Sequence, residues 1–183
     1  MTRPTLVVVS GPPGAGKTTL AHALGTAVGC PVISRDEIKE GMAHATPGFT
    51  PDPVDDLALP TLSVFFDVLT VLLRAGVTTI AEAAFRDRLW RPGLEPLLTS
   101  ADLRIVHCVV PAAVALSRIG LRRKDNPLRR VHSAPVEPDP IAHAHRHNAF
   151  DRITLDAPTL EVDTTAAYHP ALPEIVSFIN SRS

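Results

Sequence analysis

Residues Leu6–Thr18, LVVVSGPPGAGKT, decide the fold of this chain. The run up to Ser10 is continuous and rich in β-branched residues, as expected of a strand that is buried on both faces of a sheet. Residues 11–18 match the complete Gly-x-x-x-x-Gly-Lys-Ser/Thr pattern of a phosphate-binding loop, the Walker A motif. Helical spacing follows at 19–24. A glycine-rich turn between a strand and a helix can be only a turn, but the complete motif in this context predicts a nucleotide site.

The residue types of the loop give it a defined chemistry. Glycines at 11, 14 and 16 permit left-handed backbone and close approach to a phosphate, so that successive N–H groups point inward at a helix N-terminus. We expect Lys17 to reach the β- and γ-phosphates and the Thr18 hydroxyl to complete a Mg²⁺ shell. The expected nucleotide contacts here are Gly11, Pro12, Pro13, Gly14, Ala15, Gly16, Lys17, Thr18 and Thr19.

Bulk composition narrows the class of protein. The 183 residues are 45% hydrophobic, which predicts one domain over 1–183 with a substantial core. A net charge of −1, from 18 basic and 19 acidic residues, indicates no extended nucleic-acid track or membrane surface. The two cysteines, Cys30 and Cys108, suggest reduced intracellular thiols. Residues 1–4 lack the features of a signal peptide and no apolar run is long enough to cross a membrane, so we expect a cytoplasmic location.

Strand-like and helix-like runs alternate along the chain, which is typical of a parallel sheet covered by helices. We predict an α/β fold of the P-loop NTPase type, with a five-stranded parallel sheet and helices on both faces. In the helix before the third strand, the solvent face is expected to carry Ser63, Asp67, Thr70 and Arg74, and the inward face Val64, Phe65, Val68, Leu69 and Leu72. The expected strands are 5–10, 31–34, 77–82, 104–110 and 159–163, and the expected helices are 17–28, 36–43, 55–75, 88–99, 111–124, 139–149 and 171–180.

A second candidate site follows the second strand. Residues 32–38, VISRDEI, place Asp36 just beyond the carboxyl end of a short strand, where ligands bind in open α/β sheets. A carboxylate there can accept a proton from an attacking hydroxyl. Asp36 also fits a helix N-cap, but capping does not explain the neighbouring Arg35, whose guanidinium suits an anionic or hydroxyl-rich substrate.

With these residues in place, the sequence resembles the P-loop kinases of small hydroxylated compounds, and most closely the kinase domain of polynucleotide 5′-hydroxyl kinases. The resemblance covers roughly residues 5–165 and rests on the phosphate loop, on Arg35-Asp36-Glu37 and on Arg118 followed by Arg122-Arg123. It implies that Asp36 is the general base, that Arg35 contacts the substrate and that Arg122 clamps the transferring phosphoryl group. It also implies an arginine-rich lid, at approximately 118–147, in which Arg118 and Arg122 contact the nucleotide, and adenine contacts at Asp163 and Thr164.

The sequence departs from other P-loop proteins after its third strand. Motor-type and switch-type NTPases carry an aspartate there on the Mg²⁺ shell, whereas this chain has Glu82. Glu82 could hold Mg²⁺ through water, bind the substrate or be a surface charge, and Arg86 lies at the same sheet edge as a further substrate contact. In the lid, planar guanidinium groups would stabilise charge that develops during phosphoryl transfer. His143 and His147 share a helical face, but no cysteine is near and we do not expect a metal there.

These observations favour an ATP- and Mg²⁺-dependent phosphotransferase with an alcohol group as acceptor, such as a sugar, a nucleoside or a natural product. Three alternatives remain open. A polynucleotide 5′-hydroxyl kinase fits Arg35-Asp36 but not the single Trp and single Tyr. A toxin-like kinase of sugar nucleotides has the same parts, and a non-catalytic nucleotide switch would not need Asp36. The residues do not identify the acceptor or the oligomeric state.

Overall fold

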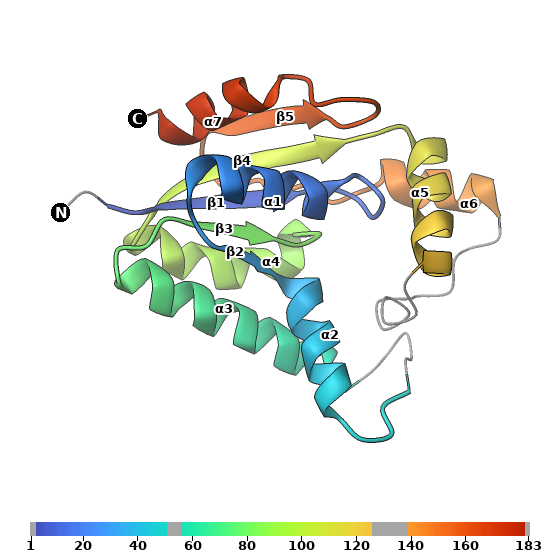
Figure 1. The fold of residues 1–183 in the computed structure, drawn as a ribbon, viewed down its shortest axis with the longest axis horizontal. Helices are drawn as coiled ribbons and strands as arrows, with labels where there is room; N and C mark the ends of the chain where they lie inside the picture. Colours follow the sequence, from blue (N-terminus) through green and yellow to red (C-terminus); the bar gives the residue numbers. More distant parts are fainter. Residues whose placement is uncertain (1–2, 51–55, 126–138, 182–183) are drawn as a thin grey trace.

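The computed structural model describes residues 3–50, 56–125 and 139–181. Its centre is a five-stranded parallel sheet in the order β2-β3-β1-β4-β5, and every strand points to the same end of the molecule (Figure 1). The strands are β1 (Thr5–Ser10), β2 (Val32–Ser34), β3 (Thr79–Glu82), β4 (Asp102–Val109) and β5 (Thr159–Asp163). This confirms the predicted α/β fold and places the ends of each strand within two residues of their expected positions.

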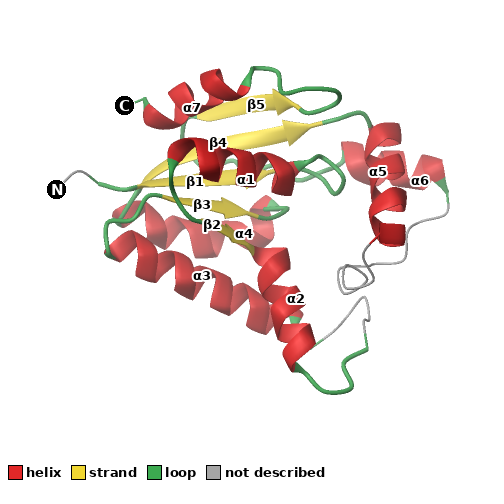
Figure 2. Cartoon of the chain, in the orientation of Figure 1, coloured by secondary structure: helices red, strands yellow, loops and turns green. Residues whose placement is uncertain are grey.

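The helices also follow the expected order (Figure 2). They are α1 (Lys17–Val28), α2 (Arg35–Ala45), α3 (Ala58–Arg74), α4 (Asp87–Leu94), α5 (Ala112–Asp125), α6 (Pro140–Asn148) and α7 (Leu172–Asn180), with a 3₁₀ turn, η1, at Glu95–Thr99. The single helix predicted over 88–99 is therefore wrong beyond Leu94. Pro96 has no N–H to bond the carbonyl four residues earlier, so the α-helix gives way to a 3₁₀ turn.

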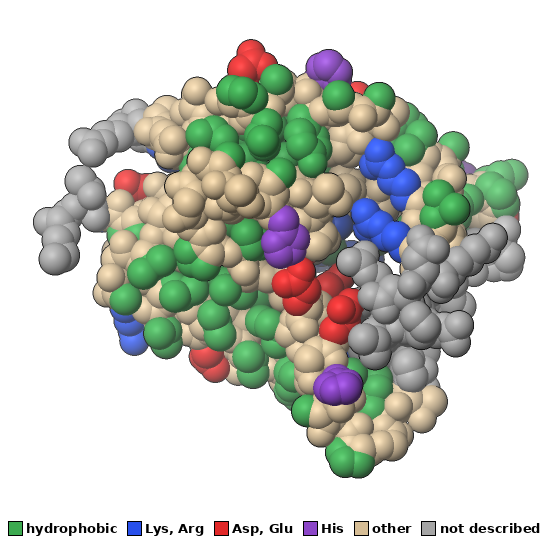
Figure 3. All heavy atoms as spheres, viewed as in Figure 1, with side chains coloured by type: hydrophobic (Ala, Val, Ile, Leu, Met, Phe, Trp, Pro, Cys, Tyr) green, Lys and Arg blue, Asp and Glu red, His purple; other side chains and the backbone are tan. Residues whose placement is uncertain are grey.

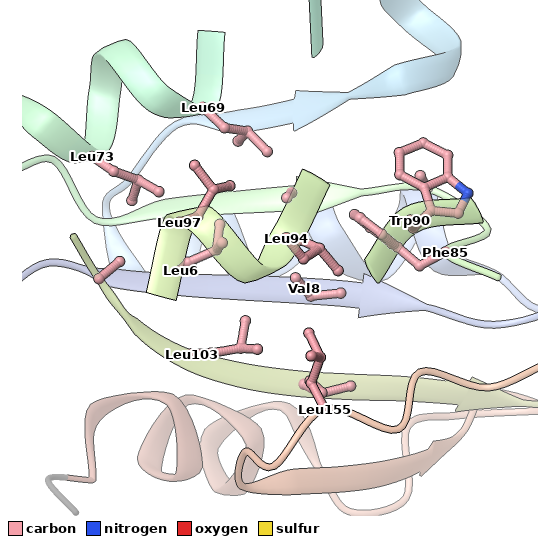
Figure 4. Close-up of a cluster of buried hydrophobic side chains, with 14 of the residues drawn as sticks. Leu6, Val8, Leu69, Leu73, Phe85, Trp90, Leu94, Leu97, Leu103 and Leu155 are labelled. Carbon is pink, nitrogen blue, oxygen red and sulfur yellow. The ribbon is translucent and has the colours of Figure 1, made fainter. Parts of the chain in front are cut away.

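Two hydrophobic cores hold helices against the two faces of the sheet. On one face, Leu6 and Val8 of β1 and Leu103 of β4 pack against side chains of α3, α4 and η1 (Figure 4). On the other face, Val7, Val9 and the alternate residues of β3 to β5 pack against α1 and α7. Alternation of successive β1 side chains between two buried faces explains why the LVVVS run shows no polar residue until its end.

The inward face of α3 differs from the prediction most clearly at Val64. The buried residues are Thr61, Phe65, Leu69 and Leu73, which recur every four residues. Val64, which was expected to point inward, is 40% exposed. One residue corresponds to about 100° of helix rotation, which moves Val64 off the buried stripe. Asp67 is exposed, as the prediction required.

The carboxyl ends of the strands form the edge where the predicted site residues meet. Register pairs Val9 with Glu82 and Ser34 with the same Glu82, immediately before the phosphate loop begins. Helix α2 leaves this edge on one side, and α5 and α6 lie on the other (Figure 1). The middle of the expected lid, 126–138 with Arg129 and Arg130, lies outside the described residues. Across the described ranges, no helix is both long and apolar enough to cross a membrane.

Candidate active site

The phosphate loop connects β1 to α1 and has the backbone that its sequence predicts. Gly11, Gly14 and Gly16 have φ values of 144°, 82° and 73°, in the region that favours glycine. The space around them is also filled. A Cβ atom on Gly11 would lie 2.5 Å from the carbonyl oxygen of Cys108, and one on Gly14 would lie 2.6 Å from that of Ala115. The glycines therefore serve both the curvature of the loop and its packing against β4 and α5.

Three side chains meet where the loop enters α1. The hydroxyl of Ser34, at the end of β2, donates to Oε2 of Glu82 across 2.7 Å, and the Thr18 hydroxyl is also hydrogen-bonded to the Glu82 carboxylate. The Lys17 ammonium donates to the carbonyl of Pro12 across 3.0 Å, which holds it over the loop. Glu82, predicted from sequence as a metal or substrate contact, thus lies beside Thr18 and within electrostatic reach of Lys17, the two loop side chains expected to contact metal and phosphate.

Glu82 carries its carboxylate in an unusual environment. The residue is only 2% exposed. Burial raises its pKa above the ordinary range for a glutamate, although the Lys17 ammonium and the hydrogen bonds from Ser34 and Thr18 act in the opposite direction. Asp36 adds a further upward push, which shows that its carboxylate lies within electrostatic reach. The negative charge at this point is incompletely compensated by the protein.

Asp36 lies at the start of α2, on the side of the sheet edge next to Glu82. Its side chain is 52% exposed, and the guanidinium of Arg35 lies 3.3 Å from Oδ1. The N-cap of α2 is Ser34, so Asp36 is the second residue of the helix and the alternative reading of Asp36 as the N-cap is wrong. Glu37, the next residue, pairs with His22 of α1 at 2.8 Å and links the two helices that follow β1 and β2.

Arg118 and Thr164 were predicted as nucleotide contacts, and the structure shows which protein atoms they contact. Arg118 of α5 donates to the carbonyls of Thr164 and Thr165 at 2.7 and 2.9 Å. The Thr164 hydroxyl donates to the carbonyl of Ala15 in the phosphate loop across 2.9 Å. Asp163 is exposed, and its Oδ1 accepts from the N–H of Thr165. Arg118 and Thr164 contact the phosphate loop, and Asp163 is the last residue of β5.

For two other predicted residues, Arg122 and Arg86, the structure gives a position in the fold. Arg122 follows Arg118 by one helical turn on α5. Arg86 is exposed at the turn between β3 and α4. In the space-filling view, acidic side chains over α2 face basic side chains beside α5 across a hollow (Figure 3). Acidic side chains therefore gather over α2, where Arg35 also lies, and basic side chains gather beside α5.

Sequence reasoning missed Ser34 and gave the paired histidines no role. Ser34 is 3% exposed and binds Glu82, a contact that depends on the β2–β3 register and that no motif announces. The rings of His143 and His147 lie 6.0 Å apart, and Nε2 of His147 bonds the carbonyl of Val110. Within the described ranges, no group of three or more potential ligands could hold a metal ion. A Mg²⁺ ion beside Thr18 and Glu82 would therefore need further oxygen ligands from a bound nucleotide or from water.

A parallel sheet whose first strand ends in a Walker A loop, with a buried carboxylate on the adjacent strand, defines a P-loop nucleotide-binding protein. Comparison with known proteins gives the family. The chain belongs to the AAA_33 family of AAA domains, whose model matches residues 6–137. None of the curated proteins compared with the chain gives a significant match.

Solved structures with the same fold include several kinases. A candidate kinase from Chloroflexus aurantiacus J-10-fl is 26% identical, with a TM-score of 0.84 and 97% of each chain covered. A sugar kinase from Janibacter sp. HTCC2649 is 20% identical, with a TM-score of 0.63 over 98% of this chain and 95% of that one. A gluconokinase from Sinorhizobium meliloti 1021 is 20% identical, with a TM-score of 0.56 over 97% and 89%. The last two likenesses bear on the fold alone.

Proposed function

We propose that this protein is an ATP-dependent kinase that transfers the γ-phosphoryl group to a hydroxyl of a small acceptor. One observation carries the proposal. The exposed carboxylate of Asp36 shares the sheet edge with the phosphate loop and lies within electrostatic reach of Glu82, which is itself bonded to Thr18 of the loop. A nucleotide switch needs no such carboxylate. The likeness to a protein described as a kinase, at 26% identity, supports the same reading.

The proposed reaction follows from the two sides of the site. The loop N–H groups and Lys17 hold the β- and γ-phosphates, while Arg35 orients the acceptor beside Asp36. Asp36 accepts the proton of the acceptor hydroxyl. The hydroxyl oxygen bonds to the γ-phosphorus, and the bond between the γ-phosphorus and the bridging oxygen of the β-phosphate breaks. Arg122 offers a planar guanidinium to the charge on the transferring group. The products are ADP and a phosphate monoester.

The residues beside Lys17 fit a Mg²⁺ ion that is shared with the nucleotide. Hydroxyl and carboxylate oxygens are the ligands that Mg²⁺ prefers, and the pair present here is Thr18 with Glu82. Glu82 is buried with part of its charge uncompensated, which favours a cation nearby. A bound Mg²⁺ would neutralise charge on the phosphates. Thr18 would hold the ion directly, and Glu82 would orient its water ligands.

An acceptor screen tests the proposal. Purified protein is incubated with ATP and Mg²⁺ against sugars, sugar acids, nucleosides, sugar nucleotides and 5′-hydroxyl oligonucleotides, and products are detected as a mass gain of one phosphoryl group. We expect one class of small acceptors to be phosphorylated, and Lys17→Ala to abolish the product while the protein stays folded. Phosphorylation of the oligonucleotide alone would reassign the acceptor. ATP binding with no transfer to any acceptor would favour the nucleotide switch.

A further inference from the structure

Arg118 is tied to protein atoms through four of its N–H groups. Nη2 donates to the carbonyls of Thr164 and Thr165 at 2.7 and 2.9 Å, and Nη1 lies 3.4 Å from both the carbonyl of Gly14 and the hydroxyl of Thr164. A guanidinium has five N–H groups in a planar fork, so the two terminal nitrogens are committed to these four acceptors. A side chain held in this way is not free to track a phosphate.

The acceptors of Arg118 join three parts of the fold that are distant in sequence. Gly14 belongs to the phosphate loop, Thr164 and Thr165 follow β5, and Arg118 itself stands on α5. Thr164 completes the hydrogen-bond network, because its hydroxyl donates to the loop carbonyl of Ala15 across 2.9 Å. Thr164 is 6% exposed and its bond to Ala15 is buried, so losing that partner is costly, while the bonds of Arg118 are partly buried.

Packing reinforces the polar contacts at the same place. Gly14 lies so close to α5 that an added Cβ would fall 2.6 to 2.9 Å from atoms of Ala115, one turn before Arg118. A Cβ on Gly16 would meet the Thr164 hydroxyl at 3.3 Å and Nη1 of Arg118 at 3.6 Å. Two successive turns of α5 therefore rest against the two sides of the loop.

We propose that Arg118 is a positioning residue that, together with Thr164, holds the phosphate loop in its nucleotide-binding shape and fixes the base of α5 against it. The structural part of this inference does not depend on the proposed kinase function; only the expected effect of the Arg118 variants on turnover rests on it. Arg118 and Thr164 then act on the nucleotide through the loop backbone. Arg122, one turn further along the fixed helix, is held on the side of α5 that faces the loop.

The first test uses the nucleotide-free protein and needs no acceptor. Amide hydrogen exchange of peptides covering 11–22 is compared in the unmodified protein, Arg118→Gln, Thr164→Val and Thr164→Ser. We expect exchange to be about tenfold faster in the first two variants and nearly unchanged in Thr164→Ser, which keeps the hydroxyl. Arg74→Gln, at an exposed position at the end of α3, is the control and is expected to have no effect.

The second test separates positioning from direct binding. Affinity for ATP with Mg²⁺ is measured by calorimetry, and we expect it to fall about tenfold in Arg118→Gln and in Arg118→Lys, because an ammonium cannot reproduce the planar fork. With an identified acceptor, the KM for that acceptor is expected to stay unchanged. Thr164→Val and Thr164→Ser decide the matter if the Arg118 variants fail to fold.

Two results would overturn the inference. If Arg118→Lys binds ATP normally and Arg118→Gln leaves exchange of the free loop unchanged, Arg118 is a charged ligand of the nucleotide. If neither exchange nor affinity changes in any variant, the contacts have no role in shaping the loop. Failure of the proposed function looks different: phosphotransfer would be absent with every acceptor, while the exchange pattern of the nucleotide-free protein would still follow the expectation above.

Discussion

At the scale of single residues, Glu82 shows the conflict between stability and chemistry most directly. Its carboxylate is removed from water between β1 and β2, with Ser34 and Thr18 as hydrogen-bond partners. An ionised group in this place costs free energy of folding, which the nearby Lys17 only partly offsets. Such a residue is expected at a site built to receive a cation rather than at one built only for stability.

The raised pKa of Glu82 predicts that removing its charge stabilises the folded protein, by an amount that depends on pH. When the pKa of a carboxyl is higher in the folded than in the unfolded state, the protein loses stability as pH rises from the unfolded-state pKa through the folded-state pKa. Glu82→Gln keeps an acceptor for Ser34 but carries no charge. In the nucleotide-free protein we expect its melting temperature to match the unmodified protein at about pH 4 and to exceed it at pH 7 to 8.

Thermal unfolding followed by circular dichroism across this pH range measures the effect, with Glu161→Gln as a control on an exposed glutamate. A difference in melting temperature between Glu82→Gln and the unmodified protein that stays the same at every pH would contradict the account. In the presence of ATP and Mg²⁺ the advantage is expected to shrink, because the protein that retains the carboxylate binds Mg²⁺ with the nucleotide more tightly and is stabilised more.

The sequence identifies residues whose chemistry lies within a local motif, and it misses those whose partner is set by the fold. Lys17 and Thr18 follow from the loop pattern, and Asp36 follows from its place after a strand. Ser34 could not be predicted to bind Glu82, because the pairing depends on the register of two strands 48 residues apart. The contact between Arg118 and Gly14, 104 residues apart, is hidden for the same reason.

At the scale of elements, the loop and α5 form one packed unit, and Gly14 is where they touch. We expect Gly14→Ala to lower ATP affinity at least tenfold and to destabilise the protein, because the new methyl group would collide with the Ala115 backbone at 2.6 Å. Gly76 has a similar φ, 78° against 82°, with nothing within 4 Å of an added Cβ. Gly76→Ala therefore carries the backbone strain without the collision.

Calorimetry with ATP distinguishes the two effects. Gly76→Ala is expected to lose some thermal stability and to bind ATP normally. Equal loss of affinity in both variants would mean that backbone strain, rather than contact between the loop and α5, explains the behaviour of Gly14.

Arg122 gives a second prediction at this scale. If its guanidinium stabilises the transferring phosphoryl group, Arg122→Gln should lower kcat more than it raises the KM for ATP, because the interaction strengthens as charge develops in the transition state. Steady-state kinetics with the acceptor found by screening measures both constants. An unchanged kcat would remove Arg122 from the reaction.

The order and type of the elements are the part of the fold that the sequence predicts best. The apolar runs predict β1 and β4 to within two residues, and Gly11 and Gly29 mark the ends of β1 and α1. The errors arise where a local pattern admits two packings. Val64 lies next to the buried stripe of α3, and Pro96 converts the end of one expected helix into a 3₁₀ turn. Neither outcome is decided by periodicity alone.

At the scale of the whole molecule, the sheet brings two charge systems to one edge. Acidic side chains over α2 face basic side chains beside α5, although the chain as a whole has a net charge of only −1 (Figure 3). Phosphoryl transfer needs this separation: cations around the nucleotide phosphates and a carboxylate near the attacking hydroxyl. The parallel order β2-β3-β1 delivers it, because the carboxyl ends of β1, β2 and β3 carry the loop, Asp36 and Glu82 together.

The central claim is that Asp36 makes this nucleotide site a kinase, and one comparison tests it most directly. Turnover with the identified acceptor and affinity for ATP are measured for the unmodified protein and for Asp36→Asn, which keeps the size of the side chain and loses its charge. The account predicts that turnover falls about a hundredfold or more while ATP affinity stays near normal. Undiminished phosphotransfer by Asp36→Asn would contradict it and would leave Asp36 as a polar residue in the first turn of α2.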